Sequence, residues 1–351
     1  MKRVITMFFF LSSLIIHNSL YSEIGVPENI ESLSLNLKQY FDLSNLEYDD
    51  SPYPGQSNIG HIFIPNLLIK TIYIDLIIGG WYKHIYVQFD EDSAPKKIYP
   101  YMGALLRPWE GSEFGIGNYE NLFKFPNSIY NEFLFFTERP VSSGIEFTLH
   151  RKTFNLISYL DWLEFDTEEH PEEFITGVLF EHYLFKNIYY KFYNHYHHRG
   201  GQLHKDSHPL RIEQDIVTSP LIGFRFSGVF VEMEYYLSTF SQNFRASSYG
   251  SAASLLLGYS FTKKINLSYQ FWYNNDYYHQ DAHIFYLKKK NALNRLRFDY
   301  NIYTYNKIFD LFYTMNVYGV DPPGIDFRFF GKINLNIIDF NNLDEEKPPI
   351  N

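Results

Sequence analysis

Near the end of the chain, within residues 293–340, apolar residues occupy every second position over three successive stretches. In the first stretch these residues are Leu296, Phe298, Tyr300 and Ile302, and the positions between them are polar or charged. The same pattern returns over residues 309–317 and again over residues 325–337. A period of two is the pattern of a β-strand with one apolar face and one polar face. The end of the chain is therefore predicted to form three successive two-sided strands.

Strands of roughly ten residues with charges on the second face are typical of a transmembrane β-barrel, which is apolar outside and polar inside. Comparable segments recur at residues 144–151, 229–237 and 265–273, with turn residues between them. We predict an all-β fold, an antiparallel up-and-down transmembrane β-barrel of about 14 strands, with 12 or 16 also acceptable. A soluble secreted β fold is the alternative.

Several segments have a weaker pattern. Residues 108–117 are rich in glycine, which suits a loop or a bulged strand, and residues 210–226 show no clear alternation. Residues 129–137 and 282–287 are predicted as strands, whereas the small and polar residues 241–254 are predicted as a loop. The predicted strand number depends on these assignments.

The composition and the first residues agree with a membrane barrel. Aromatic residues make up 20% of the 351 residues, and rings of this kind form girdles at membrane interfaces. Lys2 and Arg3 precede a short apolar run, which is the pattern of a secretory signal peptide. The prediction is a signal peptide at residues 1–22, one barrel domain at 23–340 and a disordered acidic tail at 341–351.

The last predicted strand, residues 331–340 (GKINLNIIDF), ends on an aromatic residue. In this feature the chain resembles bacterial outer-membrane β-barrel proteins as a class, although eleven residues follow the aromatic residue here. The resemblance implies export to the outer membrane of a diderm bacterium, where outer-membrane lipid would surround the barrel. It does not single out one family.

Charged residues on the polar faces of the strands are predicted to line the barrel interior, where charged rings set ion selectivity. They are Glu146, Asp161, Glu232, Glu234, Arg295, Arg297, Asp299, Asp310, Arg328 and Lys332. The favoured function is a pore or narrow channel for small solutes. Because both signs are present, these side chains can instead pair and close the barrel. The protein would then be a surface scaffold that binds a partner through loops at residues 197–209, 241–254 and 274–281.

Histidines are concentrated in one short segment. Neutral imidazoles bind zinc, copper or nickel, so this cluster is a candidate metal site, with a solvated loop as the alternative. The cluster consists of His195, His197, His198, His204 and His208. No cofactor is predicted, since the motifs that bind phosphates and dinucleotides are absent. The net charge of −10 argues against nucleic acid as a partner.

An outer-membrane enzyme that modifies lipid is the third possibility. Barrel phospholipases carry a His-x-Ser pair on one strand, and the chain beyond the predicted signal peptide has none. Neither His150 nor His182 stands in a recognisable catalytic pattern. No catalytic residue is therefore assigned from the sequence.

Overall fold

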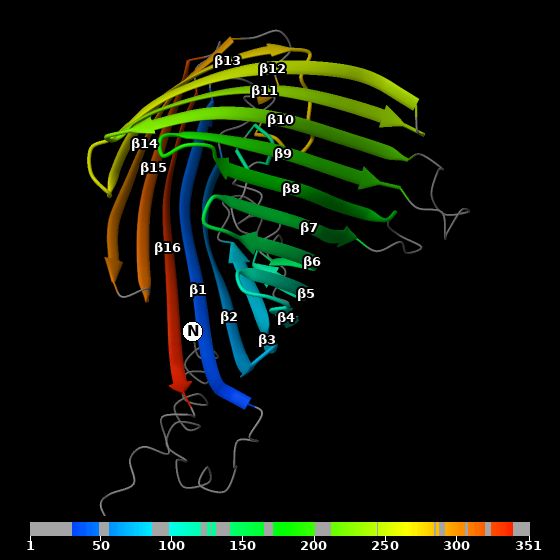
Figure 1. The fold of residues 1–351 in the computed structure, drawn as a ribbon, viewed down its shortest axis with the longest axis vertical. Coiled ribbons are helices and arrows are strands. Elements are labelled where there is room, and N and C mark those ends of the chain that lie inside the picture. Colours follow the sequence, from blue (N-terminus) through cyan, green and yellow to red (C-terminus); the bar gives the residue numbers. More distant parts are fainter. Residues whose placement is uncertain are drawn as a thin grey trace, which may run out of the picture.

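The computed structural model shows sixteen β-strands arranged as a closed barrel (Figure 1). The strands are β1 (Ile30–Tyr48), β2 (Gln56–Thr71), β3 (Ile74–Ile85), β4 (Ile98–Leu106), β5 (Ser112–Glu120), β6 (Val141–His150), β7 (Phe154–Glu164), β8 (Glu173–Tyr183), β9 (Ile188–Arg199), β10 (Glu213–Phe226), β11 (Val229–Gln242), β12 (Arg245–Ser260), β13 (Ile265–Asn275), β14 (Ala292–Tyr305), β15 (Phe309–Gly319) and β16 (Gly324–Asp339).

The structure describes residues 30–48, 56–85, 98–120, 125–126, 128–130, 141–164, 171–200, 212–243, 245–283, 286–287, 292–305, 308–319 and 324–339. The predicted signal peptide at 1–22 and the predicted tail at 341–351 lie outside the described residues. Within the described part, no helix is long and apolar enough to span a bilayer.

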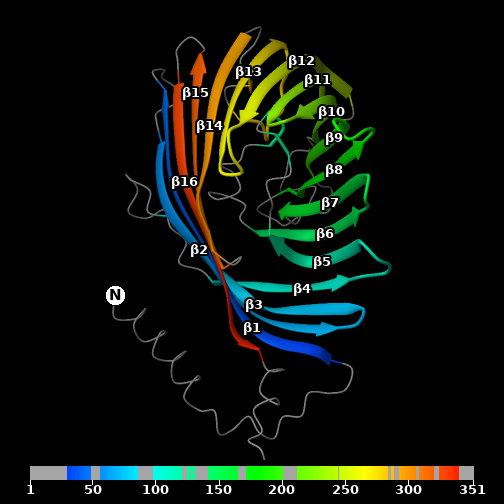
Figure 2. The ribbon, with the colours of Figure 1, turned by 60° about the vertical axis from the view of Figure 1, so that its left-hand side comes forward.

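Each strand pairs antiparallel with its neighbours in the chain, and β1 also pairs with β16, with Ser34 opposite Asp339. Figure 2 shows β2 and β16 in the wall opposite β6–β9. The closure leaves no strand edge open, as a barrel in lipid requires. The all-β antiparallel barrel predicted from the sequence is confirmed, with sixteen strands and not the favoured 14, a number that the prediction also accepted.

Two segments with a weak pattern lie in strands. Residues 210–226, which show no clear alternation, contain the whole of β10, and residues 241–254, predicted as a loop, include the first part of β12. Two predicted strands differ from the structure in their described residues. Ile129 and Tyr130 lie in a turn, whereas residues 131–137 lie outside the described residues, and the described residues of 282–287 form no strand.

The alternating residues of β13 show how the sequence forms the outer and inner faces of the barrel wall. Its residues Leu267, Tyr269, Phe271 and Tyr273 are exposed on the outer face, whereas Ser268, Gln270, Trp272 and Asn274 are buried inside. Leu296 on the neighbouring β14 is also exposed. A soluble β sandwich would bury these apolar residues against a second layer. Their exposure therefore favours an outer face that contacts lipid.

The two ends of the barrel differ in the length of their connections. At the end that holds the first residue of β1 and the last of β16, β10 and β11 are joined only by Ser227 and Gly228. Both residues have a positive φ, 47° and 87°, as a two-residue hairpin turn requires. At the other end, β5–β6, β9–β10 and β13–β14 are joined by long connections. In outer-membrane barrels the short turns face the periplasm and the long loops face outward.

Part of the β13–β14 connection folds into the barrel. Tyr277 and Tyr286 from this connection are 1% exposed and pack edge-to-face on Trp272, with ring centroids 5.4 and 4.9 Å away. At Gly250 of β12, an added Cβ would lie 2.0 Å from the carbonyl oxygen of Asp276, so only glycine permits this approach. The prediction of a surface loop at residues 274–281 is therefore wrong.

A buried ion pair joins the first and last strands. Arg328 of β16 contacts Asp42 of β1 through its Nε, and the two residues are 7% and 2% exposed. Ser44 donates a second hydrogen bond to Asp42, at 2.8 Å. Removing one member leaves the other charge buried, which costs about 3–5 kcal/mol in comparable pairs. This pair therefore holds the barrel closed where the two ends of the sheet meet.

We expect Arg328→Ala to lower the free energy of unfolding by about 3–5 kcal/mol, because the buried carboxylate of Asp42 loses its contact with the guanidinium group. Arg297→Ala is the matched control, since the Arg297–Asp299 pair is partly exposed and should contribute at most about 1 kcal/mol. Guanidinium unfolding in detergent, followed by tryptophan fluorescence, measures both variants. Equal effects of the two substitutions would contradict the assigned role of Arg328.

Candidate functional site

The inner face of β8–β10 carries histidines and carboxylates close to the long-loop end. His195 and His197 lie two residues apart on β9, so both side chains point to the same face of the wall. Asp215 of β10 stands directly opposite His197 in the strand register, and Glu173 is the first residue of β8. His195, His197 and Asp215 are all at most 2% exposed.

The β13–β14 connection brings a second set of polar residues to this wall, namely His279, Gln280 and Asp281. Asn274 fixes the connection, because its Nδ2 donates to the carbonyl of Tyr286 at 2.9 Å and its Oδ1 accepts from the amide of Tyr277 at 2.7 Å. These bonds hold both sides of the inserted segment to the end of β13.

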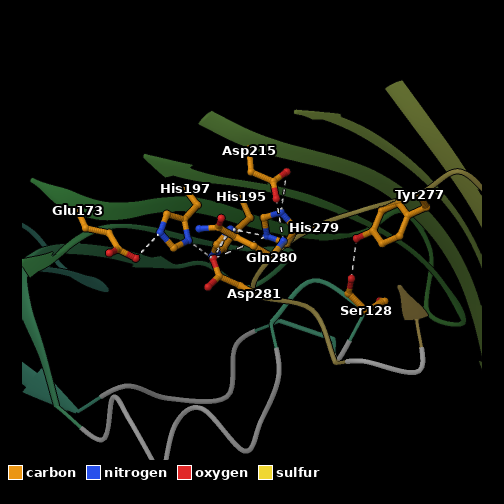
Figure 3. A network of polar contacts seen from close by, with 9 residues as sticks. All are labelled: Ser128, Glu173, His195, His197, Asp215, Tyr277, His279, Gln280 and Asp281. Carbon is orange, nitrogen blue, oxygen red and sulfur yellow. Dashed lines mark hydrogen bonds and ion pairs between the residues drawn. The ribbon is translucent and has the colours of Figure 1, made fainter. Parts of the chain in front are cut away.

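His279 lies between a histidine and an acid (Figure 3). Its Nε2 is 2.9 Å from Nδ1 of His195, and its Nδ1 is 3.1 Å from Oδ1 of Asp215. The other carboxylate oxygen of Asp215 accepts a hydrogen bond from the amide of Gln280 at 2.7 Å. Nδ1 of His279 lies at ion-pair distance from Asp215 but outside hydrogen-bond geometry. A proton on Nδ1 is the tautomer that leaves the lone pair of Nε2 to His195. The result is a carboxylate–imidazole–imidazole chain buried in the barrel.

His197 bridges two carboxylates. Its Nδ1 is 2.7 Å from Oδ2 of Asp281, and its Nε2 is 2.8 Å from Oε1 of Glu173. The ring can donate to both acids only as an imidazolium, so this geometry favours a positive charge at His197. Arg199 follows at the rim, with its Nε 3.8 Å from Oε2 of Glu173. His197 and Arg199 therefore balance the negative charges of Glu173 and Asp281 on the loop-side flank of the chain formed by Asp215, His279 and His195.

Aromatic rings enclose His195 on its other side. The ring centroids of Phe125, Tyr130 and Tyr159 lie 5.5, 5.9 and 6.4 Å from that of His195. Gly177 stands beside His195 in the register, and an added Cβ there would lie 2.6 Å from Tyr159 and 2.9 Å from Phe125. The absence of a side chain at Gly177 thus gives the rings room. An apolar wall lowers the local dielectric constant and strengthens the polar contacts.

Tyr277 links the two inserted segments. Its hydroxyl donates to the carbonyl oxygen of Ser128 at 2.6 Å (Figure 3). Ser128 Oγ donates to the hydroxyl of Tyr236 at 2.9 Å. Burial raises the pKa of Tyr277 well above its ordinary value, and the negative charges of Asp215 and Glu234 add to the effect. The hydroxyl therefore stays protonated and acts as a donor. Residues 128–130 and the β13–β14 connection form one packed unit inside the barrel.

The structure divides the predicted histidine cluster. His195 and His197 enter the buried network, whereas His198 faces the other side of β9 and stacks on Phe174, with ring centroids 4.7 Å apart. His204 and His208 lie outside the described residues. The metal site predicted at these five histidines remains a prediction.

The sequence predicts a surface loop at residues 274–281, so His279 and Asp281 are absent from its candidate site residues. The signal is the short run YYHQD at residues 277–281, where two potential ligands follow two tyrosines. His279 meets His195 across 84 positions of the chain, so no local spacing reveals the pair. Asp215 lies in the poorly patterned segment that became β10 and was missed for the same reason.

The ten charged residues predicted to line a pore are all on described strands. Several are paired inside the wall. Asp299 accepts from Arg297 at 2.9 Å, and Lys191 lies 3.9 Å from Glu232. Glu234 accepts hydrogen bonds from Ser219 and Tyr236. A role of these residues in conduction remains a proposal.

Comparison with solved structures indicates an outer-membrane β-barrel, and comparison of the sequence with known families identifies one family. The sequence pattern of the family described as Lipid A 3'-O-deacylase-type matches residues 26–327. The fold is similar to a loop L8 deletion mutant of OmpT, an outer membrane protein of Vibrio cholerae, with a TM-score of 0.51 and 7% identity over 86% of this chain and 99% of that chain.

The fold is also similar to Pseudomonas aeruginosa OccK5 (OpdH), with a TM-score of 0.51 and 10% identity over 88% of this chain and 99% of that chain. Among curated proteins, none is significantly similar in sequence. The fold is that of bacterial outer-membrane β-barrel proteins, as the sequence predicted. At such low identity, these two structures support the fold alone.

Proposed function

Because the chain belongs to the Lipid A 3'-O-deacylase-type family, we propose that it is an outer-membrane hydrolase that removes an ester-linked acyl chain from a lipid A-type glycolipid. The observation that carries the proposal is the buried chain of Asp215, His279 and His195 inside the barrel. Histidine is the most frequent general base in enzymes, and a carboxylate commonly orients it.

The position of the network supports a substrate from the outer leaflet. His195 and His197 lie close to the end of β9 from which the long β9–β10 connection starts, and Asp215 lies near the beginning of β10. Long connections face the exterior in outer-membrane barrels. The network is thus on the side where the sugar and ester groups of an outer-leaflet glycolipid would lie, while the apolar outer face suits its acyl chains.

The chemistry assigned to the network is activation of a water molecule. In this proposal the imidazole pair of His195 and His279 accepts the proton of the attacking water, and Asp215 holds His279 in the required tautomer. The water oxygen bonds to the ester carbonyl carbon, and the bond to the sugar oxygen then breaks as that oxygen receives the proton. His197 holds the carboxylates of Asp281 and Glu173 in place beside this chain.

Mass spectrometry of lipid A incubated with the refolded, purified barrel tests the proposal. The expected product has lost one ester-linked acyl chain and retains its amide-linked chains. Samples are first checked for folding by comparing heated and unheated protein on a gel. Lipid A that stays intact on prolonged incubation with folded protein, in both detergent and vesicles, would overturn the proposal.

A solute pore is the second candidate. It is favoured by the charged inner wall, where Arg295, Arg297 and Asp299 follow one another on the same face of β14. Several of these charges are paired, and inserted segments fill the space beside β9–β13, which supports the hydrolase over a wide channel. Conductance in planar bilayers separates the two candidates, and large open-channel steps from the unmodified protein would favour the pore.

A further inference from the structure

We propose that His195, His279 and Asp281 form a site for one divalent transition-metal ion, with zinc as the best fit. The three residues are at most 2% exposed and come from the β9 wall and the inserted β13–β14 connection. The catalytic role of the ion rests on the proposed hydrolase function, because the ion would activate the attacking water. The binding of the ion can be tested without that function.

The geometry of three atoms carries the inference. Nδ1 of His195 and Nε2 of His279 are 2.9 Å apart, and Oδ2 of Asp281 lies 3.9 Å from the first atom and 4.0 Å from the second. The circle through these three points has a radius of about 2.1 Å, which agrees with zinc–nitrogen and zinc–oxygen bonds of ~2.0–2.2 Å. An ion slightly outside the plane keeps all three bonds within about 0.2 Å of ordinary lengths.

The type of donor selects the class of ion. Two imidazoles and one carboxylate suit zinc and its neighbours among the transition metals, whereas calcium prefers six to eight oxygen atoms. Three protein ligands with a fourth position left for water are the arrangement of catalytic zinc sites. A zinc ion lowers the pKa of its bound water to ~7, which supplies a hydroxide near neutral pH.

Neighbouring residues hold the ligands in place. Asp215 faces the Nδ1 of His279 at 3.1 Å, which leaves Nε2 available as the ligand atom. His197 lies 2.7 Å from the Oδ2 of Asp281, the oxygen assigned to the ion. Carboxylate partners of this kind orient metal-bound histidines, and their loss weakens metal binding ~10–100-fold. The positive ion would also offset the burial of the carboxylates of Asp215 and Asp281.

Without the ion, a shared proton holds the two imidazoles 2.9 Å apart. Metal binding requires Nδ1 of His195 to give up this proton, and the neutral ring then carries its single proton on Nε2. Two ligand atoms of one tetrahedral ion are about 3.4 Å apart, so the rings must separate by about half an ångström. Rotation of His279, which lies on a connection and not on a strand, provides this movement.

Titration of the chelator-treated, refolded protein with zinc tests the site by calorimetry and by metal analysis after desalting. We expect about one zinc per chain, retained in the presence of excess calcium, and loss of binding in His195→Ala, His279→Ala and Asp281→Ala. His198→Ala is the matched control, since His198 lies on the other face of β9 and should leave binding unchanged. Heated and unheated gels verify that each variant folds.

Asp215→Asn provides a second measurement in which all three ligands remain. Its zinc dissociation constant should rise ~10–100-fold, and the cobalt-loaded wild-type protein should show the visible absorption of tetrahedral cobalt. The absence of saturable zinc binding, or binding that is unchanged in folded His279→Ala, would overturn the proposed site. Zinc binding without deacylation would instead contradict the proposed function and leave the site standing.

Discussion

Replacing His279 by alanine is expected to lower kcat/KM for release of the acyl chain by about 1,000-fold, within the range that a positioned proton acceptor contributes. His279 touches both His195 and Asp215, so its loss breaks the chain at its centre. The same loss is expected whether the water is activated by the imidazole pair alone or by a bound ion. Initial rates from mass spectrometry of lipid A at several substrate concentrations measure this effect.

Two further variants define the role of His279. His198→Ala should retain the wild-type rate, because His198 stacks on Phe174 on the other side of β9. Asp215→Asn should lower kcat more than it changes KM, since Asp215 acts by positioning His279 and not by holding substrate. A folded His279→Ala variant that keeps the wild-type rate would place the reaction elsewhere in the barrel.

The two-sided strands of the barrel could be predicted from the sequence because one face contacts lipid and the other is polar. β13 keeps this alternation through Leu267, Tyr269 and Phe271. β10 loses it, because Val217 and Leu221 on its inner face join the aromatic core while Ile216 and Ile222 face outward. A strand that is apolar on both faces has no period of two, which explains why residues 210–226 were poorly assigned.

The first part of β12, residues 245–254, was assigned to a loop for a different reason. This part is rich in glycine, alanine and serine, a composition that usually indicates a loop. In the structure Gly250 meets the backbone of Asp276 and Tyr277, and Ala252 is buried against the inserted unit. The small side chains make room for a segment that fills the barrel. Their spacing cannot be interpreted until that segment is known to fold inward.

The candidate site could be predicted only in part, because its halves are distant in the sequence. His195 and His197 stand out as neighbours on one strand, and this half was identified. Its completion by His279 and Asp281 depends on how Asn274 and Trp272 hold the β13–β14 connection inside the barrel. The alternation in the sequence predicts only the two faces of each strand. The contact of His279 and Asp281 with β9 depends on how the β13–β14 connection folds, which this alternation does not predict.

Replacing residues 277–286 by a short glycine-serine linker is expected to convert a barrel with little conductance into an open channel. Tyr277 and Tyr286 pack on Trp272 of the wall, and Tyr277 also holds the turn at Ser128 by a 2.6 Å hydrogen bond. Their removal clears the space beside β9–β13, and a sixteen-stranded barrel without such segments leaves an aqueous channel. Single-channel recording in planar bilayers measures the change.

Two single variants test whether the inserted segment itself blocks the barrel. Tyr277→Ala removes a buried ring and its bond to Ser128, so we expect frequent brief openings, whereas Tyr278→Ala removes a more exposed ring and should conduct like the wild type. The linker variant should also lose deacylation, because it lacks His279 and Asp281, and this links the filled interior to the reaction. Equal conductance of the wild type and the linker variant would show that these residues do not close the barrel, and equally large conductance of both would favour the pore over the hydrolase.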